Sequence, residues 1–214
     1  MKVLVVGANG KVGKRLVQLL KESDKHTVRA MIRIEEQAEF FQNLGVETVV
    51  ASLEDSVEKF AEAAKGCDAI VFTAGSGGQT GYDKTLLIDL DGAVKTIEAA
   101  EKVGIKRFVM VSSFQAHNRE NWQESIKPYY VAKHYADRIL EQSELTYTII
   151  RPGWLKDDPG TGKVIAAENL KDGSIPRDDV ARTIFTVLDE ENTYYRSFDL
   201  MSGDIPISDA LKNL

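Results

Sequence analysis

Short runs of β-branched and aliphatic residues alternate along the chain with longer stretches in which apolar residues recur every three to four positions. The first pattern is typical of buried strands and the second of amphipathic helices. Strands are predicted at Lys2–Val6, Thr27–Ile32, Glu47–Ala51, Ala69–Phe72, Arg107–Val111, Thr146–Ile150 and Arg196–Leu200. Helices are predicted at about Gly10–Ser23, Glu35–Leu44, Val57–Ala64, Lys84–Val103, Tyr129–Ser143 and Arg177–Asp189. Such alternation favours βαβ units, so we expect an α/β fold with a doubly wound parallel sheet and helices on both faces.

The domain organisation follows from what the chain lacks. No Pro/Ser-rich linker, repeat or low-complexity tract interrupts its 214 residues, so we expect a single domain over residues 1–214. Two segments have no clear period, Gln115–Pro128 and Trp154–Ile175. Each follows a predicted strand end, at the sheet edge where doubly wound folds bind ligands, so we expect both to frame a pocket.

Composition narrows the range of partners. The 27 basic and 33 acidic side chains give a net charge of −6, which argues against nucleic acid as a partner. The single cysteine, Cys67, excludes an intramolecular disulfide and fits a reducing compartment. The first apolar run is too short for a signal peptide, and no run approaches the ~18 residues that cross a bilayer. A cytoplasmic protein without a membrane partner is therefore expected, and a monomer and a homodimer both remain open.

The glycines at Gly7, Gly10 and Gly13 follow the first predicted strand. Taken alone, such a cluster can be an ordinary tight turn. Between a strand and a helix, however, the three glycines permit the turn, the close approach of a pyrophosphate and tight packing of the helix on the sheet. The helix then directs unpaired N–H groups and the positive end of its dipole at the phosphates. The pattern therefore predicts a dinucleotide-binding Rossmann-type fold.

The end of the second predicted strand bears on the choice of dinucleotide. An acidic residue there would bind the ribose 2′-hydroxyl of NAD, whereas an arginine accommodates the 2′-phosphate of NADP. Arg33 takes this place, Glu35 comes two residues later, and Lys11 in the glycine loop could add a second positive charge. We expect NADP(H) rather than NAD(H), although Arg33 and Lys11 could each be an ordinary surface residue.

A tyrosine and a lysine stand four residues apart on the predicted helix that begins near Pro128. Tyr129 and Lys133 would share one face of that helix, where an ammonium beside a phenol is expected to lower the pKa of the phenol. The hydroxyl could then act as an acid or a base near neutral pH. The spacing is weak by itself, but it follows a glycine loop and a strand that ends in Ser112 and Ser113.

With these motifs in order, the sequence resembles the short-chain dehydrogenase/reductase superfamily, in particular its atypical single-domain members related to nucleotide-sugar epimerases and NAD-dependent epimerase/dehydratases. The likeness covers nearly the whole chain. It is carried by the Tyr-Lys pair and by the motifs Gly-Ala-Asn-Gly-Lys-Val-Gly at 7–13, Val-Phe-Thr-Ala-Gly-Ser at 71–76, Ile-Asp-Leu-Asp-Gly-Ala at 88–93, Arg-Phe-Val-Met-Val-Ser-Ser at 107–113 and Tyr-Thr-Ile-Ile-Arg-Pro-Gly at 147–153.

The resemblance implies a set of cofactor-binding residues, taken position by position. Those expected around the phosphates and the adenosine are Gly7, Asn9, Gly10, Lys11, Val12, Ser52 and Leu53. Those expected along the ribose and the nicotinamide are Ala74, Gly75, Ser112, Lys133, Pro152, Gly153 and Trp154.

The resemblance also implies catalytic residues. Ser113 would orient the substrate, Tyr129 would transfer a proton, and Lys133 would hold the ribose and tune the tyrosine. Ser112 is the competing candidate for the serine. One departure stands out: Asp89 replaces the active-site asparagine of many relatives, so the standard proton relay cannot be assumed.

Other polar residues carry weaker predictions. His26, His117 and His134 have no metal-ligand spacing, so no metal site is expected. His117 could contact substrate, since it lies in the loop after Ser113. Asp157 and Asp158 have the pattern of a solvated turn.

Two functions follow from these predictions. The preferred one is an NADP-dependent oxidoreductase that acts on a small carbonyl, quinone or flavin-like substrate by hydride transfer. The alternative is a non-catalytic NADP-binding redox sensor, which would not need the Ser-Tyr-Lys set. An epimerase of nucleotide sugars is disfavoured, since the chain after the sixth predicted strand is too short for a large substrate lobe.

Overall fold

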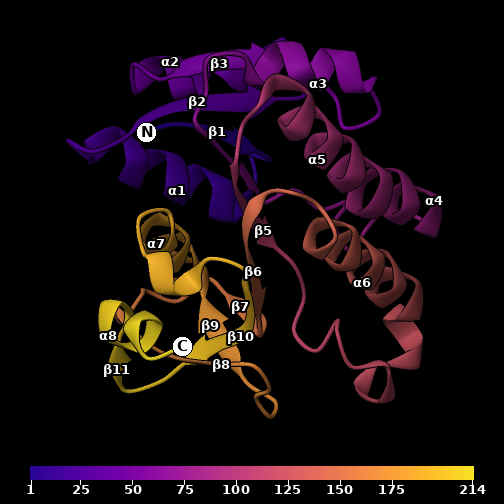
Figure 1. Ribbon diagram of the computed structural model, residues 1–214, viewed down its shortest axis with the longest axis vertical. Helices are drawn as coiled ribbons and strands as arrows, with labels where there is room; N and C mark the ends of the chain where they lie inside the picture. Colours follow the sequence, from indigo (N-terminus) through magenta and orange to yellow (C-terminus); the bar gives the residue numbers. More distant parts are fainter.

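The computed structural model describes all residues from 1 to 214 and is built around one large sheet (Figure 1). Its nine strands lie in the order β11-β8-β10-β6-β5-β4-β1-β2-β3. These strands are β1 (Lys2–Val6), β2 (Thr27–Ile32), β3 (Glu47–Val50), β4 (Ala69–Phe72), β5 (Arg107–Val111), β6 (Thr146–Pro152), β8 (Lys163–Ala167), β10 (Arg196–Ser202) and β11 (Ile205–Pro206). Two short strands, β7 (Trp154–Lys156) and β9 (Ser174–Pro176), pair separately.

Helices connect the strands at the predicted places. The α-helices are α1 (Lys11–Glu22), α2 (Ala38–Asn43), α3 (Val57–Ala64), α4 (Tyr82–Lys84), α5 (Gly92–Val103), α6 (Lys127–Glu141), α7 (Arg177–Val187) and α8 (Ile207–Lys212). Short 3-10 helices are η1 (Glu35–Gln37), η3 (Arg119–Asn121), η4 (Glu124–Ile126) and η5 (Glu191–Thr193), and η2 (Thr85–Asp91) is a π-helical segment. None of these helices combines the length and apolarity that crossing a bilayer requires.

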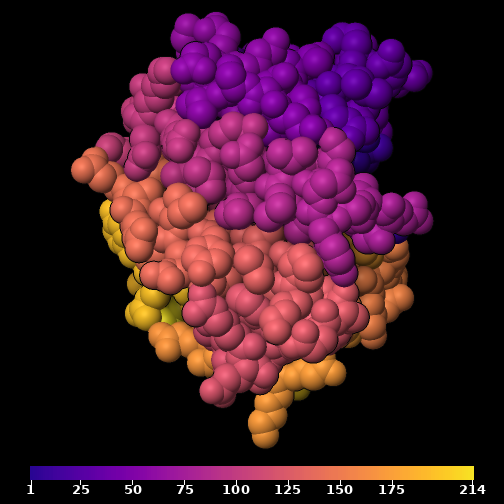
Figure 2. Space-filling view, turned by 90° about the vertical axis from the view of Figure 1, so that its right-hand side faces the viewer, coloured from indigo at the N-terminus to yellow at the C-terminus, as the bar shows by residue number.

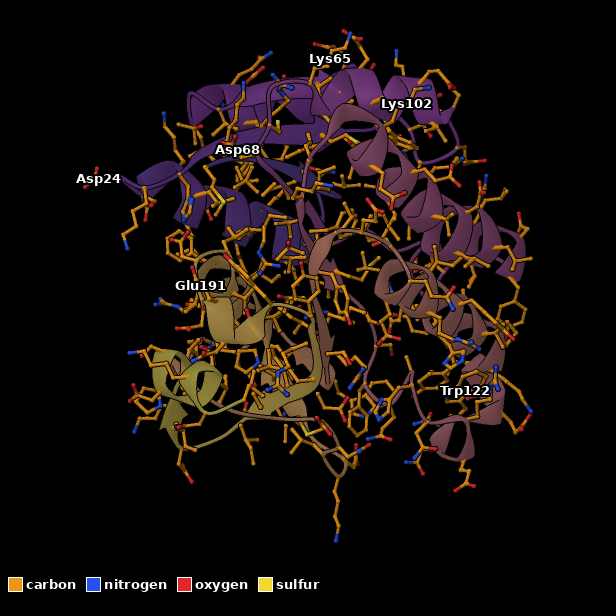
Figure 3. The ribbon with its side chains drawn as sticks, viewed as in Figure 1. Asp24, Lys65, Asp68, Lys102, Trp122 and Glu191 are labelled. Carbon is orange, nitrogen blue, oxygen red and sulfur yellow. The ribbon has the colours of Figure 1, made fainter.

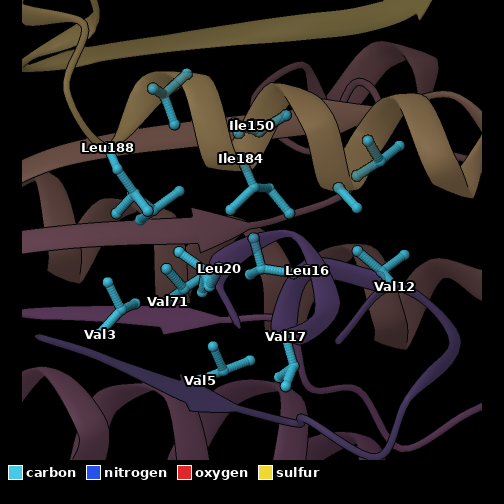
Figure 4. Close-up of a cluster of buried hydrophobic side chains, with 14 of the residues drawn as sticks. Val3, Val5, Val12, Leu16, Val17, Leu20, Val71, Ile150, Ile184 and Leu188 are labelled. Carbon is cyan, nitrogen blue, oxygen red and sulfur yellow. The ribbon is translucent and has the colours of Figure 1, made fainter. Parts of the chain in front are cut away.

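The central strands bury both faces because successive side chains point to opposite sides of a strand. In β1, Val3 and Val5 face α1, α2, α7 and α8, while Leu4 and Val6 face α3, α5 and α6. Figure 4 shows Leu16 and Leu20 of α1 packed beside Ile184 and Leu188 from the α7 side. Figure 2 views the other face, where the segments that contain α5 and α6 form much of the surface. The doubly wound fold predicted from the alternating pattern is therefore confirmed.

Sheet topology fixes where a ligand can bind. Strand β1 lies between β2 and β4 and is parallel to both, so the chain first continues from β1 to β2 and β3 on one side and then crosses to β4 on the other side. At such a switch point the loops after neighbouring strands diverge and leave a crevice at the carboxyl ends of the strands. Here the crevice lies between the loops that follow β1 and β4.

The sheet is parallel as predicted except at one edge. Strands β8 and β11 run antiparallel to their neighbours, at the side of the sheet farthest from β3. Both lie in parts of the sequence without a strand prediction. Antiparallel strands can follow short connections, whereas a further parallel strand needs a long crossover.

Candidate nucleotide-binding active site

The glycine loop has the geometry that its spacing predicts. Gly7 has a φ of +84°, and a Cβ there would lie 2.7 Å from Cα of Ala74 in the loop after β4. A Cβ on Gly13 would lie 2.8 Å from the carbonyl oxygen of Ala8. Gly10 precedes α1 and no side chain caps that helix, so its first N–H groups are available to an anion. The loop thus forms a cradle that only glycines permit.

Two adjoining hollows meet at this loop. One has a volume of about 300 Å³ and extends toward the ends of β2 and β3, and the other has about 710 Å³ and extends toward α6. Their shared lining is Gly10, Thr73, Ala74 and Gly75. The hollows therefore form one elongated cleft across the switch point, a shape that suits a dinucleotide.

The smaller hollow contains most residues predicted to bind the adenosine half. Those in its lining are Gly7, Asn9, Gly10, Arg33, Ser52 and Leu53, and Ala74 and Gly75, which were predicted along the ribose, line it as well. Arg33 is exposed and its guanidinium has no ion-pair partner, while its backbone N–H donates to Gln37 at 2.9 Å. A ribose phosphate could therefore bind the Arg33 side chain without breaking an existing interaction.

The larger hollow contains the predicted chemistry. Of the predicted residues, its lining includes Gly10, Lys11, Val12, Ala74, Gly75, Asp89, Ser112, Tyr129, Lys133 and Pro152. Lys133 is 1% exposed, and its ammonium donates to the carbonyl of Val111 at 2.9 Å. Tyr129 and Lys133 lie on α6, whereas Asp89 comes from η2, so two elements bring three functional groups to one wall.

The π-helical segment η2 gives Asp89 its position. A carboxylate oxygen of this buried residue accepts the N–H of Ser76 at 3.0 Å, and its other oxygen has no partner. Buried polar atoms are normally paired, and π-helical turns occur often at functional sites. Asp89 lines the cleft, and its orphaned oxygen fits a site that is completed by a ligand.

The electrostatics of Tyr129 differ from the expectation. Burial raises the pKa of its hydroxyl above the ordinary value, Asp89 raises it further, and a hydrogen bond with Ser113 opposes both effects. We expected Lys133 to lower this pKa, and that expectation is wrong for the protein without ligand. The Lys133 ammonium instead donates to Val111, beside the ring of Phe72. Tyr129 therefore holds its proton at neutral pH, as a proton donor must.

Asp137 is a buried residue of the site that the sequence analysis missed. It stands four residues after Lys133 on α6, and the hydroxyl of Ser112 donates to its carboxylate at 2.6 Å. Burial raises the pKa of Asp137 to about 7, although the Ser112 hydrogen bond and the Lys133 charge act in the opposite direction. Tyr129, Lys133 and Asp137 follow one another at four-residue spacing. The sequence could therefore have indicated Asp137 as the next residue on the helix face that carries Tyr129 and Lys133.

A cluster of ion pairs at the start of α1 was also missed. Asp157 lies 2.6 Å from the Lys11 ammonium and 2.9 Å from the Arg177 guanidinium. Arg15 approaches Asp157 at 4.0 Å and also pairs with Asp178. Asp157 was expected in a simple solvated turn, but it is the anion of this cluster. Arg177 lines the larger hollow and was not among the predicted site residues.

Several predicted residues lie outside the lining of the cleft. Ser113 affects the site by lowering the pKa of Tyr129, Gly153 is buried against Gly173, and Trp154 is 55% exposed. His117 contacts Asn169 at 2.6 Å, and Trp122 stacks on Tyr130 near the start of α6 (Figure 3). No group of three or more His, Cys, Asp or Glu side chains is arranged to hold a metal ion.

Fold and cleft together define a dinucleotide-binding protein of the Rossmann type. The chain matches the NAD(P)H-binding family over residues 7–191 and belongs to that family of oxidoreductase-like proteins.

Its relatives include both epimerase-like proteins and reductases. The "Uncharacterized sugar epimerase YhfK" of Bacillus subtilis strain 168 is 64% identical over 214 residues, which cover 100% of both chains. A solved structure from Bacillus halodurans, provisionally described as an NAD-dependent epimerase/dehydratase, has a TM-score of 0.94 and 45% identity, with 100% of both chains covered. ChuY, an anaerobilin reductase from Escherichia coli O157:H7, has a TM-score of 0.83 and 26% identity, covering 96% of this chain and 98% of that one.

Proposed function

We propose that this protein is an NADPH-dependent reductase of small carbonyl, quinone or flavin-like substrates, in which Tyr129 donates a proton. The observation that carries this proposal is the position of the Tyr129 hydroxyl. This hydroxyl holds its proton at neutral pH, Tyr129 lines the cleft that begins at the glycine loop, and buried Lys133 lines the same cleft. When bound, the nicotinamide would supply the hydride.

The remaining residues would bind and orient. The glycine loop would receive the pyrophosphate, and Arg33 would bind the 2′-phosphate, which is the basis for proposing NADPH over NADH. Lys133 would hold the ribose near Tyr129, and Ser113 would orient the substrate oxygen beside that tyrosine.

The outer part of the larger hollow supports a flat substrate. Its lining combines glycines of the loop after β4 with apolar and aromatic groups: Gly77, Gly78, Gly81, Tyr82, Ile126 and Leu155. Small residues leave room for a planar ring, and apolar side chains can pack against its faces. ChuY, similar along almost its whole length, is a reductase by name, which agrees with this proposal.

The test compares neighbouring tyrosines. NADPH oxidation is screened with quinones, flavins and small aldehydes, and the best substrate is then used with Tyr129→Phe. This variant keeps the ring and loses the hydroxyl, so turnover should fall by roughly 10²–10⁴ while NADPH affinity is unchanged. Tyr130→Phe is the matched control, because Tyr130 is buried and stacks on Trp122, and its turnover should stay near that of the wild type.

Full turnover by Tyr129→Phe would show that the reaction does not use this hydroxyl. If the protein binds NADPH but reduces no compound in the screen, a non-catalytic redox sensor becomes the better proposal. The observation that favours this second candidate is Asp89, because a carboxylate stands beside Tyr129 where many relatives have an asparagine and raises the pKa of the tyrosine.

A further inference from the structure

The ion-pair cluster at the start of α1 faces the same cleft as the glycine loop. Helices α1 and α7 lie side by side (Figure 1), and the contact of Arg15 with Asp178 shows that their N-terminal ends are adjacent. Lys11 and Arg177, the first residues of these helices, both line the larger hollow next to Gly10 and Val12. Two cations therefore flank the N–H groups that are available to an anion.

Without ligand, both cations are neutralised from within the protein. The carboxylate of Asp157 contacts Lys11 at 2.6 Å and Arg177 at 2.9 Å, and no other carboxylate pairs with either cation. The Lys11 and Asp157 side chains are 65% and 51% exposed. Exposed ion pairs contribute little net stability, so a more highly charged anion can displace this carboxylate at small cost.

The loop that carries Asp157 does not depend on these ion pairs for its position. Asp179 is fully buried and accepts the N–H groups of Thr161 at 2.9 Å and Gly162 at 2.8 Å. Asp178 accepts the N–H of Gly160 at 3.2 Å. The loop therefore stays anchored to the start of α7 when the Asp157 carboxylate leaves the cations.

We infer that Arg177 is a cofactor-binding residue that contacts the pyrophosphate. In the ligand-free protein, the Asp157 carboxylate occupies the position of the pyrophosphate beside Arg177 and Lys11. The inference rests on binding of the cofactor in the proposed cleft and adds Arg177, beside the start of α1, to the residues around the pyrophosphate. Arg177 can offer two parallel N–H groups to phosphate oxygens. Because NADPH and NADH share the pyrophosphate, Arg177 should act equally on both, whereas Arg33 should act on NADPH alone.

The experiment measures NADPH and NADH affinity by calorimetry in variants of the intact protein. Arg177→Gln should weaken both cofactors by a similar factor of roughly 10 to 100. Asp157→Asn removes the internal anion and should tighten both by about 3-fold to 10-fold. Arg182→Gln is the matched control, since it removes one exposed cation from the same helix outside the cleft, and it should leave both affinities within about 2-fold.

Three results would overturn the inference. They are an Arg177→Gln variant that binds both cofactors as tightly as the wild type, one that loses affinity for NADPH alone, and an Asp157→Asn variant with unchanged or weaker binding. If Arg177→Gln does not fold, the exposed Asp157→Asn variant decides the question alone. All of these measurements are cofactor affinities. They would stay the same if Tyr129 took no part in catalysis, so the failure of the proposed reaction and the failure of this inference can be told apart.

Discussion

At the scale of single residues, the site depends on buried charges with incomplete pairing. Lys133 and Asp89 are each 1% exposed, and each has only one hydrogen-bond partner within the protein. Burying a charged group is costly unless partners replace the lost water. The protein thus retains groups that a bound ligand can satisfy, and substitutions at these positions should change binding or catalysis more than folding.

Arg33 provides a test of cofactor choice. Arg33→Ala removes a charge-assisted contact to the 2′-phosphate, worth about 1.5–3 kcal/mol, so NADPH affinity should fall roughly 10-fold to 100-fold. NADH lacks this phosphate and should bind Arg33→Ala as it binds the wild type. Calorimetry with both cofactors checks this, and wild-type protein that binds NADH as tightly as NADPH would contradict the proposed preference.

Asp137 should make stability depend on pH. Its pKa of about 7 lies above the ordinary 3.8, so the folded protein keeps a proton that the unfolded chain has already released. The resulting stabilisation is full below pH ~4 and is lost as the pH rises through about 7. Asp137→Asn replaces the carboxyl group by an amide of the same shape that does not titrate. The wild type should lose about 2–3 kcal/mol of its free energy of unfolding between about pH 5 and pH 8, and the variant should not, so the variant becomes more stable relative to the wild type by this amount. Urea denaturation across this range measures it, and a constant difference would place the pKa near its ordinary value.

At the scale of elements, the β1–α1 unit separates binding from folding. Gly10 has an ordinary φ of −70°, and a Cβ there would make a tight contact, 3.1 Å from the Gly7 carbonyl oxygen, that a small shift relieves. Gly13 has no room for a side chain, because its Cβ would overlap the backbone of Gly7 and Ala8. One glycine therefore provides access for a ligand, while the other allows the helix to pack on the sheet.

Two valine substitutions test this division. Gly10→Val should abolish NADPH binding, because a branched side chain fills the pyrophosphate position, and the melting temperature should stay close to that of the wild type. Gly13→Val should destabilise the fold by roughly 1–3 kcal/mol or more through overpacking. Fluorescence titration with NADPH and thermal denaturation provide the readouts. Normal NADPH binding by folded Gly10→Val would exclude the loop from the site.

At the scale of the whole molecule, the sequence predicted the parts governed by local patterns. The pattern of apolar residues is strongly periodic in the seven predicted strands, which are β1 to β6 and β10, and in the helices between them. The strands β7, β8 and β9 were missed in the segment from Trp154 to Ile175. β7 and β9 have three residues each and pair only with one another, all three residues of β7 are exposed, and β8 pairs with β10 and β11 farther along the chain. A local pattern carries no information on such pairings.

The same distinction holds for the candidate site. The glycine loop, Arg33 and the Tyr129–Lys133 pair are recognisable from spacing. In contrast, Asp157 lies 146 residues from Lys11, and their contact depends on how α7 packs against α1. The raised pKa of Tyr129 likewise arises from burial and from Asp89 on another element, which residue types alone cannot reveal.

The central claim is that one cleft holds NADPH in a single direction, with the reactive ring beside Tyr129. A crystal structure of the complex with NADP⁺ tests this claim most directly. We expect the 2′-phosphate at Arg33, the pyrophosphate between the start of α1 and Arg177, and the nicotinamide against Tyr129 and Lys133. A nicotinamide bound away from Tyr129, or a cofactor that lies in the reverse direction with its adenine at α6, would contradict it.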